Sequence, residues 1–447
     1  MNKCNTKTEP ILLEDCNPQE LKLGEELEKG LARLEKTFDL DESARSSGAL
    51  VRRRGVGSAH DLLRIVMGYS VLDWSLRMLG MWCVTVKLCN ISKTALLHRL
   101  RNCQIWLGQL IVKILLQQRL AFPTGMNIRT RMFDASVICE PGSKGSDWRL
   151  HLGFDLGWMG MDWLQITDGH GGENMTRFPV AAGELWIGDR AYALASSVGH
   201  VLAGGAWILV RAGWRKLPFE QENGQRWDVI AWLKKANLVP AGDPQETKCW
   251  VTTPNGRFPL RLIARAIPEE AAESARRKMR REASKKGKTV DARSLYAAGF
   301  ILLLTNLPLA DWGMTQILQL YRFRWQIELA FKRLKSLLNL DGLRTRDPQL
   351  VQVYLLSKLL AALMLDRLQG QIAQQYPDWF TDTHRPLSLW RLTALLWDHF
   401  RSTIRGNITL DQIMEVFPLL RRYLCDEPRK RVSQRAHAQA IFGGLCG

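Results

Sequence analysis

Hydrophobic and polar residues alternate through much of the segment between residues 128 and 212. In residues 148–156 hydrophobic side chains occupy every second position, which is the period of a β-strand with two faces. Four further segments have a strand-like pattern and lie at residues 131–136, 161–168, 184–189 and 206–212. Residues 191–203 suit a helix between the last two strands. This order predicts a mixed sheet that begins antiparallel and continues parallel, with an α/β fold.

Helical spacing dominates the chain before this region. Leucines recur at helical spacing in residues 20–45, and residues 59–68 and 70–85 predict two more helices. A further helix begins after Ser92, and its apolar residues are expected to face inward: Leu96, Leu97, Leu100 and Ile105. Its basic residues lie on other faces and are Lys93, His98, Arg99 and Arg101. This pattern is typical of a helix-turn-helix in a DNA major groove, and also of a plain helical bundle with a solvated basic face.

The second half of the chain contains a long interruption and strong helices. Residues 213–299 hold strand-like pieces, turns and four tryptophans. Their dense basic run, 276–288, suits either a solvated helix and loop or a surface that binds phosphate. A buried strand and a helix follow, at residues 300–308 and 314–338. The apolar segment 351–365 is short and contains Lys358, so it predicts a buried helix rather than a membrane span.

Charge adds a candidate partner to this picture. The chain has 447 residues, a net charge of +18 and 46% hydrophobic residues, which predicts a globular protein of two to four domains. Residues 1–45 hold eleven acidic and seven basic side chains, so the positive excess lies in the rest of the chain. A basic body indicates a polyanion such as nucleic acid, or else a basic soluble enzyme with no such partner.

Cysteine usage and the start of the chain indicate a cytoplasmic protein. The nine cysteines are scattered, and no pair has Cys-x-x-Cys spacing, which argues against a structural zinc site and a disulfide framework. The first residues lead into acidic positions rather than an apolar stretch, so we expect no signal peptide.

One face of the predicted helix at 321–335 is polar. The residues on this face fall within one narrow stripe and are Tyr321, Arg324, Glu328, Lys332 and Lys335. Its cations favour the ionised form of Glu328, which suits a hard divalent ion, while the cations themselves suit phosphate. The alternative is a surface helix with ordinary ion pairs.

Two aspartates on the predicted sheet are candidate partners for Glu328. Asp134 lies in the first strand, and Asp189 ends a later strand at the carboxyl edge of a parallel pair, where ligands collect in open α/β sheets. The three carboxylates are expected to hold two Mg²⁺ ions about 4 Å apart, with Mn²⁺ as a substitute. Asp155 and Asp168 are rival carboxylates on the same sheet.

These motifs resemble the bacterial insertion-sequence transposases of the insertion sequence four group. Tyr321, Arg324, Glu328 and Lys335 match that group's signature Tyr-x2-Arg-x3-Glu-x6-Lys without a gap. The stretches 133–136 and 188–192 resemble those around the first two catalytic acids, with serine and alanine where threonine and glycine are usual. The resemblance spans roughly residues 60–365.

The resemblance implies an RNase H-like catalytic domain that a mostly β insertion interrupts, between helical N-terminal DNA-binding and helical C-terminal regions. It implies cut-and-paste transposition: binding of terminal inverted repeats, cleavage that frees 3′-hydroxyls, and strand transfer into target DNA. It further implies a homodimer on paired DNA ends. Relatives flip a base onto an aromatic of the insertion, for which Trp214, Trp250 and Phe300 are candidates.

The expected organisation has six parts. They are an acidic N-terminal helix and linker (1–57), a helix-turn-helix-like region (58–125), a first catalytic segment (126–212), the insertion (213–299), a second catalytic segment (300–345) and a helical dimerisation region (346–447).

Each candidate residue receives an expected role. The catalytic and metal-binding residues are Asp134, Asp189 and Glu328. The residues expected to contact double-stranded DNA are Tyr321, Arg324, Lys332, Lys335, Arg211, Arg190, Lys93, Arg99 and Arg101. The competing interpretations are a transposase-derived DNA-binding protein that no longer cuts, and a related nuclease that hydrolyses DNA without joining it.

Overall fold

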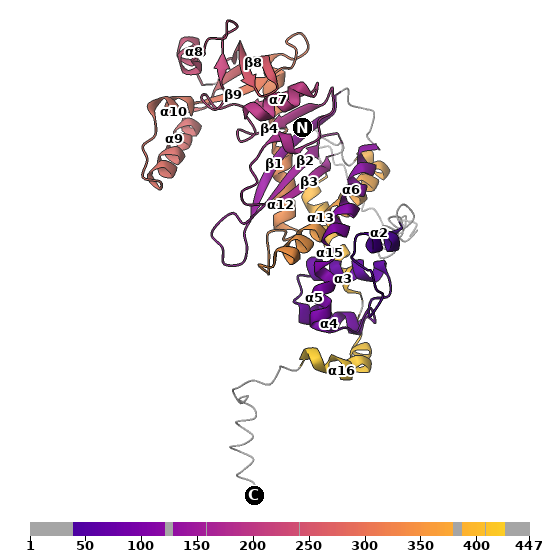
Figure 1. The fold of residues 1–447 in the computed structure, drawn as a ribbon. Coiled ribbons are helices and arrows are strands. Elements are labelled where there is room, and N and C mark those ends of the chain that lie inside the picture. Colours follow the sequence, from indigo (N-terminus) through magenta and orange to yellow (C-terminus); the bar gives the residue numbers. More distant parts are fainter. Residues whose placement is uncertain are drawn as a thin grey trace, which may run out of the picture. The chain divides into compact units, whose positions relative to one another are not determined.

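A computed structural model gives the fold for residues 39–120, 128–157, 159–240, 242–378, 387–406 and 408–424 (Figure 1). The chain forms two compact units. One contains residues 107–394, and the other contains residues up to 106 together with those from 395 onward. The predicted helix at 20–45 lies mostly outside the described residues, which include α2 (Leu40–Ser46) at its end. The finer division into six parts stays a prediction.

The larger unit is built on one mixed sheet. Its nine strands have the spatial order β3-β2-β1-β4-β5-β9-β8-β7-β6. Their bounds are β1 Thr130–Ile138, β2 Trp148–Asp155, β3 Gly160–Asp168, β4 Leu185–Gly188, β5 Trp207–Arg211, β6 Phe219–Glu220, β7 Gln245–Thr253, β8 Gly256–Ala266 and β9 Phe300–Thr305.

The pairing of the strands confirms the predicted α/β sheet. The first three strands pair antiparallel, whereas β1–β4 and β4–β5 pair parallel. The remaining pairs, from β5–β9 to β6–β7, are antiparallel. Because β9 lies between β5 and β8, the strands of the interruption extend the same sheet instead of forming a separate one.

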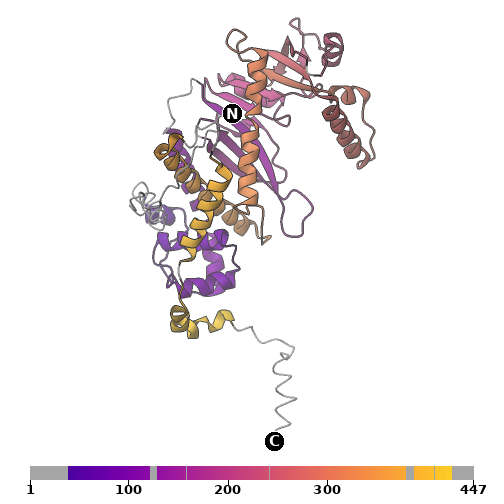
Figure 2. The same cartoon turned by 180° about the vertical axis from the view of Figure 1, so that it is seen from behind.

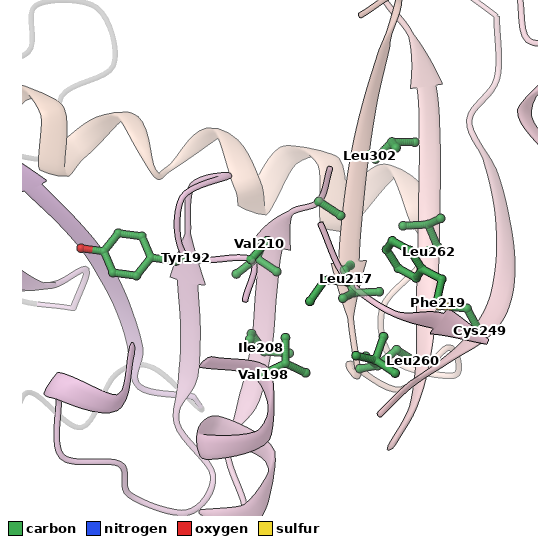
Figure 3. Packing of buried hydrophobic residues seen from close by; sticks show 14 of the residues in the cluster. Tyr192, Val198, Ile208, Val210, Leu217, Phe219, Cys249, Leu260, Leu262 and Leu302 are labelled. Atoms are coloured by element: carbon green, nitrogen blue, oxygen red, sulfur yellow. The ribbon is translucent and has the colours of Figure 1, made fainter. Parts of the chain in front are cut away.

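The interruption at 213–299 is a mixture of helix and strand, so the expectation of a mostly β segment is wrong. It contains α8 (Val229–Ala236), α9 (Glu269–Ser284) and α10 (Ala292–Ala297) besides its three strands. The basic run forms much of α9, because its Glu, Ala, Arg and Lys residues all favour helix. A single hydrophobic core joins the interruption to the rest of the unit (Figure 3). There Val198 of α7 (Ala195–Ala203), Ile208 of β5 and Leu260 of β8 are all fully or almost fully buried.

Two helices after β9 lie along one face of the sheet (Figure 2). They are α11 (Met314–Arg322) and α12 (Trp325–Ser336), and α12 packs against β1. The single helix predicted at 314–338 is therefore wrong, because the chain ends one helix and starts another at Phe323 and Arg324. Ile327, Phe331 and Leu334 form the buried side of α12, whereas Trp325 is 56% exposed.

The smaller unit is helical. Its described helices include α3 (Ala59–Val71), α4 (Leu76–Thr85), α5 (Lys93–Arg101) and α16 (Leu410–Leu424), while α6 (Gln104–Leu120) and α15 (Leu389–Arg405) cross the boundary between the units. Ser58 caps α3 and Ser92 caps α5, which confirms the helix predicted to begin after Ser92. The helix predicted at 70–85 begins only at Leu76, since Asp73 has a positive φ of 53°.

The helix after Ser92 is also shorter than predicted. It ends at Arg101, and a new helix starts at Gln104. This break changes the helical phase, so Leu96 and Leu100 are fully buried but Ile105 is 61% exposed. The expectation that Ile105 faces inward is therefore wrong.

The segment 351–365 lies within α13 (Pro348–Gln375), which packs against β3. Among the described residues this is the helix with the length and hydropathy of a membrane span, but 78% of its most apolar window is buried inside the protein.

Candidate functional site

Asp134 and Asp189 are neighbours at the centre of the sheet. The parallel ladder between β1 and β4 ends with Phe133 opposite Gly188, so the two aspartates are the next residues on adjacent strands. The amide of Ala135 donates to Oδ1 of Asp134 at 2.8 Å, and the amide of Ala191 donates to Oδ1 of Asp189 at 2.6 Å. The sheet thus brings together the two aspartates that the sequence singled out.

Burial and like charge act on Asp134. Burial raises its pKa from an ordinary value of 3.8 to about 7, and the nearby carboxylates of Asp189 and Glu173 act in the same direction. The Ala135 amide and the guanidinium of Arg324 oppose this shift. A half-buried carboxyl beside a second carboxylate is an environment in which a bound cation would be favourable.

Glu328 lies on the first turn of α12, beside the guanidinium of Arg324. Its Oε1 is 2.5 Å from Nη2 of Arg324, and the Glu328 side chain is 31% exposed. The Arg324 guanidinium also lies over the ring of Tyr321, 5.9 Å from its centroid. The negative charge of Asp134 acts to raise the pKa of Arg324. Arg324 therefore connects the acid of the helix with the aspartates of the sheet.

The two lysines of α12 differ in their surroundings. Nζ of Lys335 donates to the carbonyl of Val137 on β1 at 2.8 Å, so this lysine links α12 to the strand that carries Asp134. Nζ of Lys332, an exposed residue, lies 5.4 Å from the ring centroid of Trp390.

Basic and aromatic side chains line a cavity beside Asp189. The cavity has a volume of about 340 Å³, and its walls include Arg190, Arg211, Trp214, Lys278 and Phe300. Burial and the neighbouring positive charges of Arg211 and Arg215 lower the pKa of Arg190, so cations are crowded here. The third aromatic candidate lies elsewhere, because the Trp250 ring on β7 stacks against Arg257.

The rival aspartates are engaged in structural contacts. Asp155 is completely buried, and its Oδ2 accepts from Nε of Arg129 at 2.6 Å. It belongs to a buried charge network that also includes Arg131, Asp162 and Glu184. Asp168 accepts from the amides of His170 and Gly171, at 3.0 and 3.1 Å, and so closes the turn after β3.

The basic residues of α5 occupy different environments. Lys93 is exposed in the first turn of the helix. Arg99 donates to the carbonyls of Arg52 and Arg54, at 2.5 and 3.1 Å, and so holds the preceding basic turn against the helix. Arg101 is half-buried at the end of the helix.

Glu173 is a site residue that the sequence reasoning missed. It lies in the loop after β3, and burial followed by the charge of Asp189 raises its pKa. The signal available in the sequence was an acidic residue in a glycine-containing turn directly after a predicted strand, at residues 169–173.

The donor set suits a hard cation, because carboxylate oxygens are the ligands that Mg²⁺ and Mn²⁺ prefer. Asp134 and Asp189 are adjacent, while Glu328 is held by Arg324. Among the residues that the structure describes, no three His, Cys, Asp or Glu side chains are already grouped closely enough to hold a metal ion together.

Comparisons with known proteins agree with these features. The family model described as transposase DDE domain matches residues 168–364. The chain is 37% identical over 342 residues to the putative transposase InsL of insertion sequence element IS186A from Escherichia coli (strain K12), covering 75% of this chain and 92% of that protein. It is 37% identical over 343 residues to the transposase of IS421 from Escherichia coli, with the same coverage.

More distant matches were also found. The chain is 27% identical over 211 residues to the transposase of IS231C from Bacillus thuringiensis subsp. berliner, covering 46% of this chain and 42% of that protein. A piggyBac transposase in a synaptic complex with hairpin DNA is a structural match with a TM-score of 0.42 and 10% identity, covering 92% of this chain and 87% of that one.

Proposed function

The chain belongs to the insertion-sequence transposases with a DDE domain, and from this membership we propose how its residues cut and join DNA. It is a transposase, an enzyme that acts on DNA and depends on a divalent metal. The observation that carries the proposal is the adjacency of Asp134 and Asp189 at the end of the parallel ladder between β1 and β4, with α12, the helix that bears Glu328, packed against β1. The finer assignment of the core as an RNase H-like fold is part of this proposal.

The three acids Asp134, Asp189 and Glu328 would hold Mg²⁺, as two ions, with Mn²⁺ able to substitute. When bound, such ions activate the attacking hydroxyl and stabilise the leaving oxygen during phosphoryl transfer. The ion pair between Glu328 and Arg324 supports a further detail. A DNA phosphate that binds the Arg324 guanidinium would compete with Glu328 and release its carboxylate toward the two aspartates.

The cations around the acids would position the DNA strands. Arg324, Lys332 and Lys335 would hold phosphates near the cut, and Tyr321 would orient the strand end by a hydrogen bond or stacking. Arg190 and Arg211 would continue this surface into the neighbouring cavity. Trp214 and Phe300 line that cavity and Trp250 does not, so Trp214 and Phe300 are the better candidates to stack on an unstacked base.

Other parts of the chain would recognise and pair the transposon ends. Helix α5, through Lys93, Arg99 and Arg101, would read the terminal repeat, and the basic helix α9 would add phosphate contacts. A homodimer would pair two ends through the C-terminal helices. We propose that the protein acts in the bacterial cytoplasm.

A DNA-binding remnant without cutting activity is the second interpretation. The presence of carboxylates at all three catalytic positions favours the active enzyme. Imperfect inverted repeats beside the coding region would supply the natural substrate for a direct test.

The test is metal-dependent cleavage of DNA that carries those repeat ends. Wild type, Glu328→Ala and a control, Glu222→Ala at an exposed position of the interruption, are compared with Mg²⁺ and without it. Cleavage by the wild type and the control alone supports the assignment. If all three proteins bind the repeat and none cuts it with Mg²⁺ or Mn²⁺, the protein is a DNA-binding remnant and the catalytic assignments are wrong.

A further inference from the structure

The loop between β3 and β4 holds Glu173, whose charge acts on Asp134 and which is itself acted on by the charge of Asp189. Its Asn174 is fixed to α7, because its Nδ2 donates to Oγ of Ser196 and its Oδ1 accepts from Oγ of Ser197, each at 3.0 Å. The next residue, Met175, is completely buried and packs against Gly188, the residue before Asp189. Glu173 therefore lies two residues before Met175, whose contact with Gly188 joins this loop to the end of β4 just before Asp189.

The glycines of this loop allow it to fold tightly. A Cβ atom at Gly169 would lie 1.7 Å from the carbonyl oxygen of Ser146, and one at Gly171 would lie 2.0 Å from Oγ1 of Thr167. A side chain at either position would push the loop away from Ser146 or from Thr167. Gly169 and Gly171 therefore allow the tight backbone path that leads to Glu173.

Nearby cations leave the charge of Glu173 only partly balanced. Nη1 of Arg149 is 3.9 Å from Oε1 of Glu173, but it donates to the carbonyl of Gly171 at 2.9 Å. Nζ of Lys216 donates to the carbonyls of Arg190 and Ala191 at 2.9 and 2.7 Å. Both cations are thus held by backbone oxygens around the acids.

A buried phenol supplies an independent sign that a polar ligand belongs here. Tyr192 is completely buried, and its hydroxyl has no hydrogen-bond partner in the structure. Its oxygen points away from the hydrophobic cluster that its ring joins (Figure 3). Burial raises the pKa of Tyr192, and the negative charges of Asp134, Glu173 and Asp189 act in the same direction. An unpaired buried hydroxyl is unfavourable unless a partner arrives.

We propose that Glu173 is a fourth carboxylate of the divalent-cation site and that the Tyr192 hydroxyl donates a hydrogen bond to one of these carboxylates. The inference rests on the proposed function of Asp134 and Asp189. In this arrangement Glu173 adds negative charge to the site from the loop side, and Tyr192 orients a carboxylate, as outer-shell donors commonly do.

The test measures cation binding without DNA or turnover. Mn²⁺ is titrated into the full-length protein, and free Mn²⁺ is followed by electron paramagnetic resonance. The variants are Glu173→Gln, Glu173→Asp, Tyr192→Phe, Asp134→Asn and the exposed control Glu222→Gln. We expect Glu173→Gln to weaken Mn²⁺ binding by about tenfold or more and Tyr192→Phe by a few-fold, with Glu173→Asp intermediate. The control should bind as the wild type does.

Thermal unfolding of each metal-free variant separates folding from binding. Tyr192→Phe removes a hydroxyl that has no partner, so it should fold at least as stably as the wild type. If Glu173→Gln does not fold, the Mn²⁺ affinities of Glu173→Asp and Tyr192→Phe are compared with that of the wild type. Weaker binding by both variants supports the inference, and unchanged binding contradicts it.

The possible failures are distinguishable. If Asp134→Asn abolishes Mn²⁺ binding and neither the Glu173 variants nor Tyr192→Phe changes it, this inference is wrong and the catalytic proposal stands. If the wild type itself binds no Mn²⁺, or Asp134→Asn binds it equally well, both the fourth carboxylate and the proposed metal site are wrong.

Discussion

Arg324 and Glu328, one turn apart at the start of α12, form an ion pair with 2.5 Å between Nη2 and Oε1. The pair has the ordinary i,i+4 spacing of a helix, because Phe323 and Arg324 keep right-handed helical backbone angles where α11 gives way to α12. The negative charges of Glu328 and Asp134 both act to raise the pKa of Arg324, against the effect of burial, which lowers it. Under the proposed function, a DNA phosphate that binds Arg324 would release Glu328 from this pair.

Arg324→Ala should lower DNA strand cleavage by about 10²-fold or more, which is typical when one fixed donor to a reacting phosphate or oxyanion is removed. Arg322→Ala, which changes an exposed neighbour on the same segment, serves as the control. Single-turnover cleavage of repeat-end DNA is the measurement. Equal cleavage rates for the two variants would contradict the assigned role.

The raised pKa of Asp134 predicts a specific pH dependence of stability. Because its pKa rises from 3.8 to about 7 on folding, the folded protein binds more protons than the unfolded chain between these values. The free energy of unfolding of the metal-free protein should therefore fall as pH rises through this window. Asp134→Asn should remove the part of this decrease in the free energy of unfolding that comes from Asp134.

Denaturant unfolding of the metal-free protein at pH 5 and pH 8 checks this prediction. Adding Mn²⁺ should restore more stability at pH 8 than at pH 5, since the cation competes with the proton for the carboxylate. Parallel pH profiles for the wild type and Asp134→Asn would rule out the assignment of this titration to Asp134.

Lys335→Met tests whether Lys335 holds α12 to β1. Loss of the 2.8 Å hydrogen bond to the Val137 carbonyl should destabilise the fold. We expect a decrease of about 1 kcal/mol in the free energy of unfolding. Lys332→Met is the comparison on the same helix, because that lysine is exposed. A purely DNA-binding Lys335 would leave stability unchanged and would lower only DNA affinity.

Gly188→Ala tests the close packing under Asp189. A Cβ atom there would lie 2.7 Å from Cε of Met175 and 2.9 Å from Cβ of Tyr192. Overpacking of this kind should cost about 1–3 kcal/mol. Gly172→Ala is the matched control, because no atom lies within 4 Å of a Cβ atom built at Gly172. Thermal unfolding of the two variants should differ clearly, and equal melting temperatures would contradict the packing argument.

Arg211→Ala tests the basic cavity as a DNA surface. If Arg211 contacts one phosphate, its loss should weaken repeat-end binding and lower the slope of log affinity against log salt by about 1. Arg226→Ala, an exposed arginine of the interruption, is the control. Fluorescence anisotropy at several salt concentrations gives both quantities, and an unchanged slope for Arg211→Ala would remove this residue from the DNA surface.

Local patterns were sufficient to predict the strands and the polar stripe of the catalytic helix. The two-residue period of β2 and the helical spacing from Tyr321 to Lys335 depend on side chains that are close in sequence. The polar stripe and the predicted strands supplied Asp134, Asp189 and Glu328 as candidates, and the family motifs matched the same residues. The mixed sheet agreed with prediction because the order of strands and connections restricts the possible pairings.

The register that sets Asp134 beside Asp189, the helix break at Arg324 and the position of Glu173 required the folded chain. Each depends on contacts between residues that are distant in sequence, such as Phe133 with Gly188 and Lys335 with Val137. A one-residue shift between β1 and β4 would preserve every local pattern and separate the two aspartates. Packing between distant segments therefore decides which carboxylates form the site, because local periodicity contains no information on their mutual distance.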